Sequence, residues 1–155
     1  MQAQHPTLLT EEAVNMIGTE TPWGLPFFVE CGISRRFARA ILDTDSAYAH
    51  QESITGTQKE KVRVPNTILL CNMASGTELD FNIPLHTSGR VRGKDEVEIF
   101  RPIYIGDTIR AKTKILDINE KEGRSGKMVF VITETQYMNQ NQELVMKSRA
   151  TVIKR

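Results

Sequence analysis

Residues 108–116 have the sequence Thr-Ile-Arg-Ala-Lys-Thr-Lys-Ile-Leu, in which apolar or small side chains alternate with cations. Ile109, Ala111, Thr113 and Ile115 fall on one side of this alternation. A period of two is typical of a strand with one buried face and one face in water. We therefore predict a strand over residues 108–118.

Three further stretches have strand character, and we place these strands at about residues 90–101, 127–138 and 144–154. Residues 128–132 are apolar on both faces, which predicts a central position in the sheet. The polar segments 123–126 and 139–142 have the composition of turns between antiparallel neighbours. The second half of the chain is thus predicted to form an antiparallel sheet.

The first half has helical signals instead. Thr10 followed by two glutamates predicts a short helix that cannot run far past Ile17. A second helix is predicted near residues 33–41, with Ile33, Phe37 and Ile41 on its apolar face. A third, buried helix is predicted over residues 68–74. Helices followed by strands indicate the α+β class, as one domain over 1–155 in which residues 1–28 form an arm and the first helix.

The bulk composition excludes several classes of function. The chain has 155 residues, of which 39% are hydrophobic and 25% charged, and its formal net charge is +1. This charge predicts no nucleic-acid or membrane partner, and no apolar run is long enough to cross a bilayer. Cys31 and Cys71 lack the spacing of a metal site, so we expect reduced thiols, no metal and a cytoplasmic location.

Residues 36–50 are the strongest candidate for a site of chemistry, because a helix leads there into a polar turn. Asp43 lies just past the expected helix end, where the helix dipole disfavours a carboxylate. Two explanations stay open: Asp43 caps the following turn, or it faces a substrate.

Five segments resemble MaoC-like dehydratase domains, the family that includes (R)-specific enoyl-CoA hydratases, and in particular their N-terminal half-domain class. They are Arg-Phe-Ala-Arg-Ala-Ile at 36–41 with Asp43 and Tyr48, Val-Pro-Asn-Thr at 64–67, Phe-Arg-Pro-Ile-Tyr-Ile-Gly-Asp-Thr at 100–108, residues 121–131, and Thr-Glu-Thr at 133–135. Their order and spacing carry the resemblance from about Val29 to Arg155.

This resemblance implies a hot-dog fold, in which an antiparallel sheet wraps around a central helix and two such domains pair side by side. Family members hydrate 2-enoyl thioesters or dehydrate 3-hydroxyacyl thioesters, carried on coenzyme A or acyl carrier protein, without a further cofactor. In active members an Asp and a His, in the motif Gly-Asp-x-Asn-Pro-hydrophobic-His, handle a water molecule. A backbone N–H near the start of the central helix polarises the thioester carbonyl.

The chain departs from that motif at the histidine. Residues 42–48 are Leu-Asp-Thr-Asp-Ser-Ala-Tyr, so Asp43 is retained while Tyr48 stands where the histidine would be. A phenol cannot accept a proton from water as imidazole does. The resemblance therefore implies a hydratase or dehydratase subunit whose partner, a second hot-dog chain, supplies the Asp–His pair. A variant of this hypothesis is an active homodimer in which His50 or His86 of the chain itself takes the place of the missing histidine.

Each candidate residue also has a structural explanation. Tyr48 would then pack the loop, and the polar surroundings of His50 and His86 would leave them solvated rather than in a tunnel. Following Pro65, Asn66 and Thr67 would cap the third helix rather than present free N–H groups to a thioester carbonyl.

A basic cluster, Arg90, Arg92 and Lys94, would contact the phosphates of coenzyme A or lie on a solvated strand face. Two other functions stay open: a non-catalytic, regulatory acyl-CoA-binding protein, and an acyl-CoA thioesterase that uses Asp43.

Overall fold

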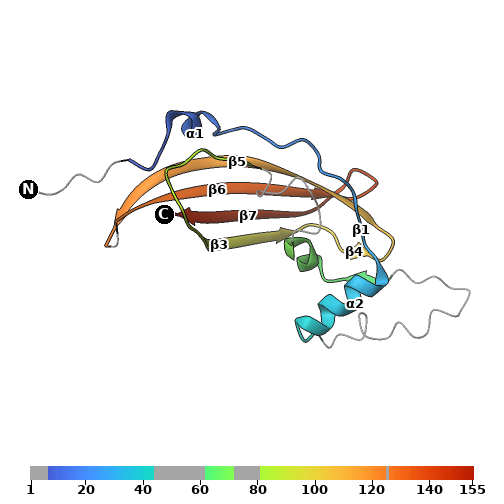
Figure 1. Ribbon diagram of the computed structural model, residues 1–155. Coiled ribbons are helices and arrows are strands. Elements are labelled where there is room, and N and C mark those ends of the chain that lie inside the picture. Colours follow the sequence, from blue (N-terminus) through green and yellow to red (C-terminus); the bar gives the residue numbers. More distant parts are fainter. Residues whose placement is uncertain (1–6, 44–61, 72–80, 125) are drawn as a thin grey trace, which may run out of the picture.

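A curved antiparallel sheet dominates the computed structural model, which describes residues 7–43, 62–71, 81–124 and 126–155 (Figure 1). Its strands lie in the order β1-β5-β6-β7-β3. Their bounds are Phe27–Phe28 for β1, Thr108–Gly123 for β5, Gly126–Met138 for β6, Leu144–Lys154 for β7 and Arg90–Ile99 for β3. All four predicted strands are thereby confirmed, as are the α+β class and the central position of β6.

The sequence pattern underestimated the length of β5. This strand runs five residues beyond the predicted end at Ile118, because its ladder with β6 continues to the turn, where Gly123 lies opposite Gly126. Gly126 has a φ of 108°, a left-handed conformation that costs glycine little.

The buried face of the sheet, called the inner face below, carries two apolar clusters. The first gathers around β1, the start of β5 and the end of β6, and includes Phe27, Ile109 and Tyr137. The second lies at the other end of the same strands and includes Ile115 and Val129. The expected alternation in β5 is therefore confirmed.

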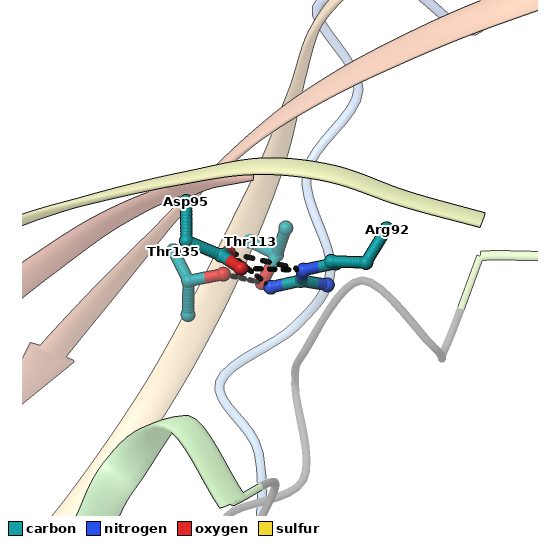
Figure 2. Close-up of polar contacts among 4 residues, drawn as sticks. All are labelled: Arg92, Asp95, Thr113 and Thr135. Atoms are coloured by element: carbon teal, nitrogen blue, oxygen red, sulfur yellow. Dashed lines mark hydrogen bonds and ion pairs between the residues drawn. The ribbon is translucent and has the colours of Figure 1, made fainter. Parts of the chain in front are cut away.

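Between the two clusters the inner face carries hydroxyl groups instead of hydrocarbon. Thr113, Thr133, Thr135 and Ser148 are all buried there. The hydroxyl oxygens of Thr113 and Thr135 lie 2.7 Å apart and share a hydrogen bond (Figure 2). This band of hydroxyls makes the middle of the core polar, which a purely apolar pattern does not predict.

A β-bulge at Gly93 interrupts the pairing of β3 with β7. Before the bulge, Arg90 lies opposite Lys154, and after it, Asp95 lies opposite Ala150. Residues directly opposite each other in an antiparallel pair share a face of the sheet. Arg90 and Asp95 therefore both lie on the inner face, although an uninterrupted strand would place residues five positions apart on opposite faces.

The first helix follows its predicted start signal. Helix α1 spans Glu11–Asn15, and the Thr10 hydroxyl accepts a hydrogen bond of 3.0 Å from the N–H of Ala13. The Leu8 and Leu9 side chains that precede it pack against the second cluster. The N-terminal arm is thus part of the core from Leu8 onward.

Helix α2 spans Cys31–Ala40, and its apolar face differs from the predicted one at one residue. Ile33 and Phe37 pack against the first cluster as expected. Ile41 does not, since the helix has ended at Ala40 and 47% of Ile41 is exposed.

The third helix is a 3-10 helix, η2, over Asn66–Cys71. It begins two residues earlier than predicted, and residues 72–74 of the predicted segment lie outside the described part of the chain. Before it, β2 (Arg63–Val64) pairs with β4 (Ile103–Tyr104) as a separate two-stranded sheet. Ile68 and Leu69 of η2 are fully buried in the first cluster, so the expected burial of this segment is confirmed. None of the described helices is long and apolar enough to cross a membrane.

Candidate active site

The chain leaves α2 through a tight C-terminal turn. The N–H of Leu42 donates to the carbonyl of Arg39 at 3.2 Å, and the N–H of Asp43 donates to the carbonyl of Ala38 at 2.9 Å. Leu42 has a φ of 55°. These two bonds around a left-handed residue define a Schellman motif, which satisfies the last carbonyls of the helix.

The left-handed residue of such a motif is usually glycine, because a Cβ raises the energy of this conformation. The resembling family has glycine before its aspartate, and this chain has Leu42, whose side chain is 84% exposed. The backbone therefore keeps a shape suited to glycine even though the residue is leucine. That shape positions the half-buried Asp43 directly after the helix end.

The backbone N–H of Asp43 is used by the turn, and the residue makes a further interaction besides this bond. The following turn, which includes Tyr48 and His50, lies outside the described residues. The roles of these three residues stay predictions.

At the start of η2 the amide of Ile68 donates to the carbonyl of Pro65 at 3.1 Å. The Asn66 side chain is buried, and its Nδ2 donates to the carbonyl of Arg101 at 2.8 Å. Asn66 thus ties η2 to the connection between β3 and β4. Thr67 is exposed at the start of the helix.

The structure brings α2 and η2 together, because Phe37 and Ile68 belong to the same cluster. His86 lies elsewhere. It is exposed, its N–H donates to the carbonyl of Leu8 at 3.1 Å, and its neighbour Leu85 packs on the second cluster. Figure 1 shows α2 and the segment that leads into β3 at opposite ends of the sheet.

A positioning group that the sequence analysis missed is the Gly106–Asp107 pair. The N–H of Gly106 donates to the carbonyl of Val29, and the N–H of Val29 donates to the carbonyl of Asp107, both at 2.9 Å. This reciprocal pair fixes the chain two residues before α2 begins. The signal was present in the Gly-Asp-Thr segment, to which we assigned no role.

Two of the three basic residues of β3 are paired with carboxylates of the same strand. The guanidinium of Arg92 donates to Asp95 through its Nε at 2.9 Å, and the Lys94 ammonium lies 2.8 Å from Glu96 (Figure 2 shows the former). Arg90 has no carboxylate within ion-pair distance among the residues described. Over the same residues, no three His, Cys, Asp or Glu side chains gather as a metal site.

Comparison with known proteins identifies the family. A family model described as the FAS1-like dehydratase domain region matches residues 15–148. This match covers most of the chain, so the chain belongs to the FAS1-like dehydratase family. A search of the curated proteins finds no match.

Solved structures agree on the fold. A chain of the truncated HadBC (3R-hydroxyacyl-ACP dehydratase) complex from Mycobacterium tuberculosis has a TM-score of 0.67 and 23% identity, covering 89% of this chain and 96% of that one. A MaoC-like dehydratase has a TM-score of 0.73 and 17% identity, covering 92% of this chain and 43% of the other. A chain of the ChsH1-ChsH2 complex from Mycobacterium tuberculosis has a TM-score of 0.70 and 16% identity, covering 93% of this chain and 89% of that one. The predicted MaoC-like, hot-dog fold is confirmed.

Proposed function

We propose that this chain is a subunit of an enoyl-thioester hydratase or 3-hydroxyacyl-thioester dehydratase, and that a second hot-dog chain completes its site. The turn that ends α2 carries the proposal. Its two hydrogen bonds hold Asp43 directly after the end of α2 despite a leucine in the left-handed position, which supports the assignment of Asp43 as the aspartate of the family motif.

The chemistry needs a base that titrates near neutral pH. A histidine meets this need and a tyrosine, with a pKa near 10, does not. Asp43 would orient the water molecule, and the partner's Asp–His pair would transfer its proton. We assign the exposed start of η2 at Thr67 to the thioester carbonyl, with Pro65, Asn66 and Tyr48 as neighbours of the substrate. The acyl group would arrive on coenzyme A or acyl carrier protein.

Strand β3 offers the surface for the partner. It lies at the edge of the sheet, and all ten of its residues are exposed. Val91, Val97 and Ile99 are between 38% and 51% exposed there. A long edge strand with exposed apolar side chains is a template for pairing with another chain.

The order of charges along β3 favours an antiparallel neighbour with a similar strand. Its first half carries Arg90, Arg92 and Lys94, and its second half carries Asp95, Glu96 and Glu98. Antiparallel pairing of two such strands places the basic half of one against the acidic half of the other, whereas parallel pairing opposes like charges. HadBC and ChsH1-ChsH2, both described as complexes, support a partner of the same fold.

The test is hydration of crotonyl-CoA, followed by the loss of the enoyl-thioester absorbance. We expect the purified chain alone to be inactive and its complex with a hot-dog partner that carries the intact histidine motif to be active. Asp43→Asn in this chain should lower the turnover of the complex, because the neutral amide replaces one acceptor oxygen by a donor and orients the water molecule less well. Asp117→Asn, on β5, is the matched control and should leave turnover unchanged.

Three results would contradict the proposal. Full activity of the chain alone, abolished by His50→Ala or His86→Ala, would establish the homodimer instead. Binding of crotonyl-CoA without hydration under any pairing would establish an acyl-CoA-binding protein, and release of free coenzyme A thiol would establish a thioesterase.

A further inference from the structure

A small cavity lies at the end of the sheet remote from α2, between β3, β7 and β6. It has a volume of about 50 Å³. Its apolar walls are Phe81, Ile83, Val131 and Val152, and its polar lining consists of Arg90, Thr133 and Lys154. We call it the corner cavity. A volume of this size exceeds the minimum that one water molecule needs.

Two cations face each other at the corner cavity, and neither is paired with an anion among the residues that the structure describes. Arg90 and Lys154 lie directly opposite in the β3–β7 pair, on the inner face. Like charges opposite each other destabilise a sheet. Neither side chain has a carboxylate within ion-pair distance in the described part of the chain, whereas the neighbouring Arg92 and Lys94 each have one.

Burial and the charge of Arg90 act on Lys154 in the same direction. Partial burial lowers the pKa of Lys154 below its ordinary value of 10.5, and the charge of Arg90 lowers this pKa further. An acidic neighbour would instead raise the pKa of Lys154.

The third polar group in the corner cavity is a buried hydroxyl that has no hydrogen-bond partner in the described part of the chain. Thr133 is 2% exposed, and its Oγ1 makes no hydrogen bond. The adjacent Thr135, on the same strand and face, is satisfied by Thr113. Buried polar atoms are nearly always paired, so an unpaired one that lines a cavity points to a missing partner.

We propose that the corner cavity binds a short-chain carboxylate that carries a hydroxyl or carbonyl oxygen on its body. The carboxylate would lie between Arg90 and Lys154, the body would contact the four apolar side chains, and its second oxygen would share a hydrogen bond with Thr133. Phosphate fits less well, because its oxygens would lie against hydrocarbon on the apolar side. This site is separate from the one proposed at Asp43, and its occupancy is independent of any hydration activity.

Lactate and propionate test the proposal, since they differ only by one hydroxyl group. Binding to the full chain is followed by the amide NMR shifts of Thr133 and Lys154 at constant ionic strength. We expect saturable binding of lactate and about tenfold weaker binding of propionate, from the loss of one hydrogen bond in a buried site. Inorganic phosphate should also bind more weakly than lactate, because its oxygens would lie against the apolar side chains. Thr133→Val should abolish the difference between lactate and propionate.

Charge variants locate the carboxylate. Lys154→Gln and Arg90→Gln should each weaken lactate binding at least about tenfold, by removing a charged hydrogen bond. Lys147→Gln is the matched control, because this lysine lies on the same strand but on the outer face, near Glu134. None of these changes removes a partner from a buried group, so all the variants should fold.

Three results would overturn the proposal. They are the absence of a saturable shift with lactate, equal binding of lactate by the Lys154→Gln protein, and phosphate binding as tight as lactate binding. The last would make the corner cavity a general anion site.

Discussion

The Asp107 carboxylate and the Gln140 side chain are joined by a hydrogen bond of 2.9 Å, from Gln140 Nε2 to Asp107 Oδ1, across 33 residues of sequence. The other carboxylate oxygen of Asp107 accepts from the N–H of Tyr104 at 2.8 Å, and Gln140 Oε1 accepts from the N–H of Thr108 at 3.0 Å. Together these bonds fasten the turn between β4 and β5 to the turn between β6 and β7.

Replacement of Asp107 by alanine should therefore destabilise the fold. The change removes the acceptor of the Tyr104 N–H and of one Gln140 donor at a part-buried place, which should lower the free energy of unfolding by about 1–2 kcal/mol. Urea denaturation measures this loss. Glu98→Ala, on the exposed face of β3, should change the value by less than about 0.5 kcal/mol. Equal effects of the two substitutions would show that the Asp107 bonds contribute nothing.

Replacement of Leu42 by glycine should stabilise the chain. Leu42 is held at a φ of 55° and is almost fully exposed, so glycine relieves strain without loss of packing. We expect a gain of about 1 kcal/mol in the free energy of unfolding, because the relieved strain exceeds the entropy that glycine adds to the unfolded chain. Leu25→Gly provides the comparison: Leu25 is also exposed but has an ordinary φ, and glycine there should be neutral or destabilising. A lower free energy of unfolding for both variants would contradict the inference that the backbone of Leu42 is strained.

The Thr113–Thr135 hydrogen bond predicts a coupling between two substitutions. Thr135→Val alone removes one hydroxyl of the buried pair, and we expect a cost of about 1–2 kcal/mol in the free energy of unfolding. The double change to valine should cost less than the sum of the single changes, by about 1 kcal/mol. Chemical denaturation of the four proteins gives this interaction energy directly. Strict additivity would mean that the hydrogen bond is energetically silent.

Glu120 predicts a pH-dependent attachment of the N-terminal arm. Its carboxylate accepts from the N–H of Leu8 at 2.6 Å, and Lys127 lies 3.0 Å away. The Leu8 N–H, and next the Lys127 ammonium, lower the pKa of Glu120 below its ordinary value of 4.5. A lowered folded-state pKa stabilises the fold above about pH 4.5, and this stabilisation is lost as the pH falls through the folded-state value.

Hydrogen exchange of the Leu8 amide should therefore accelerate at acidic pH beyond the intrinsic trend. Glu120→Gln should remove this acceleration, and Glu122→Gln, two residues away on an exposed position, should keep it. If exchange of the Leu8 amide follows the same pH profile in all three proteins, the attachment of the arm does not depend on the ionisation of Glu120.

Most of the sheet could be predicted because its strands alternate. In β5 each buried position, from Ile109 to Ile115, is separated from the next by a single cation or half-buried residue, and period two leaves no competing helical interpretation. β7 has the predicted bounds for the same reason. The extension of β5 to Gly123 was missed because Asn119–Glu122 are polar and pair through their backbones.

The site could be predicted only in part, because its geometry depends on the backbone. The spacing of Asp43 from the helix indicated an unusual aspartate, but a leucine gives no sign of a left-handed φ. Ile41 matched the apolar period and yet lies outside the helix, since the turn at Leu42 stops the helix one residue earlier. Asn66 looked like a cap, whereas its side chain bonds to Arg101, a partner 35 residues away that no local pattern can indicate.

The extra residue at Gly93 has an evolutionary consequence. A Cβ there would lie 3.1 Å from the Ile153 side chain, so the position resists exchange for a larger residue. Its deletion, however, would restore a regular strand and turn either Arg90 or Asp95 to the opposite face of the sheet. One codon gained or lost can thus create or erase the cationic corner of this domain while every other residue of β3 is inherited unchanged.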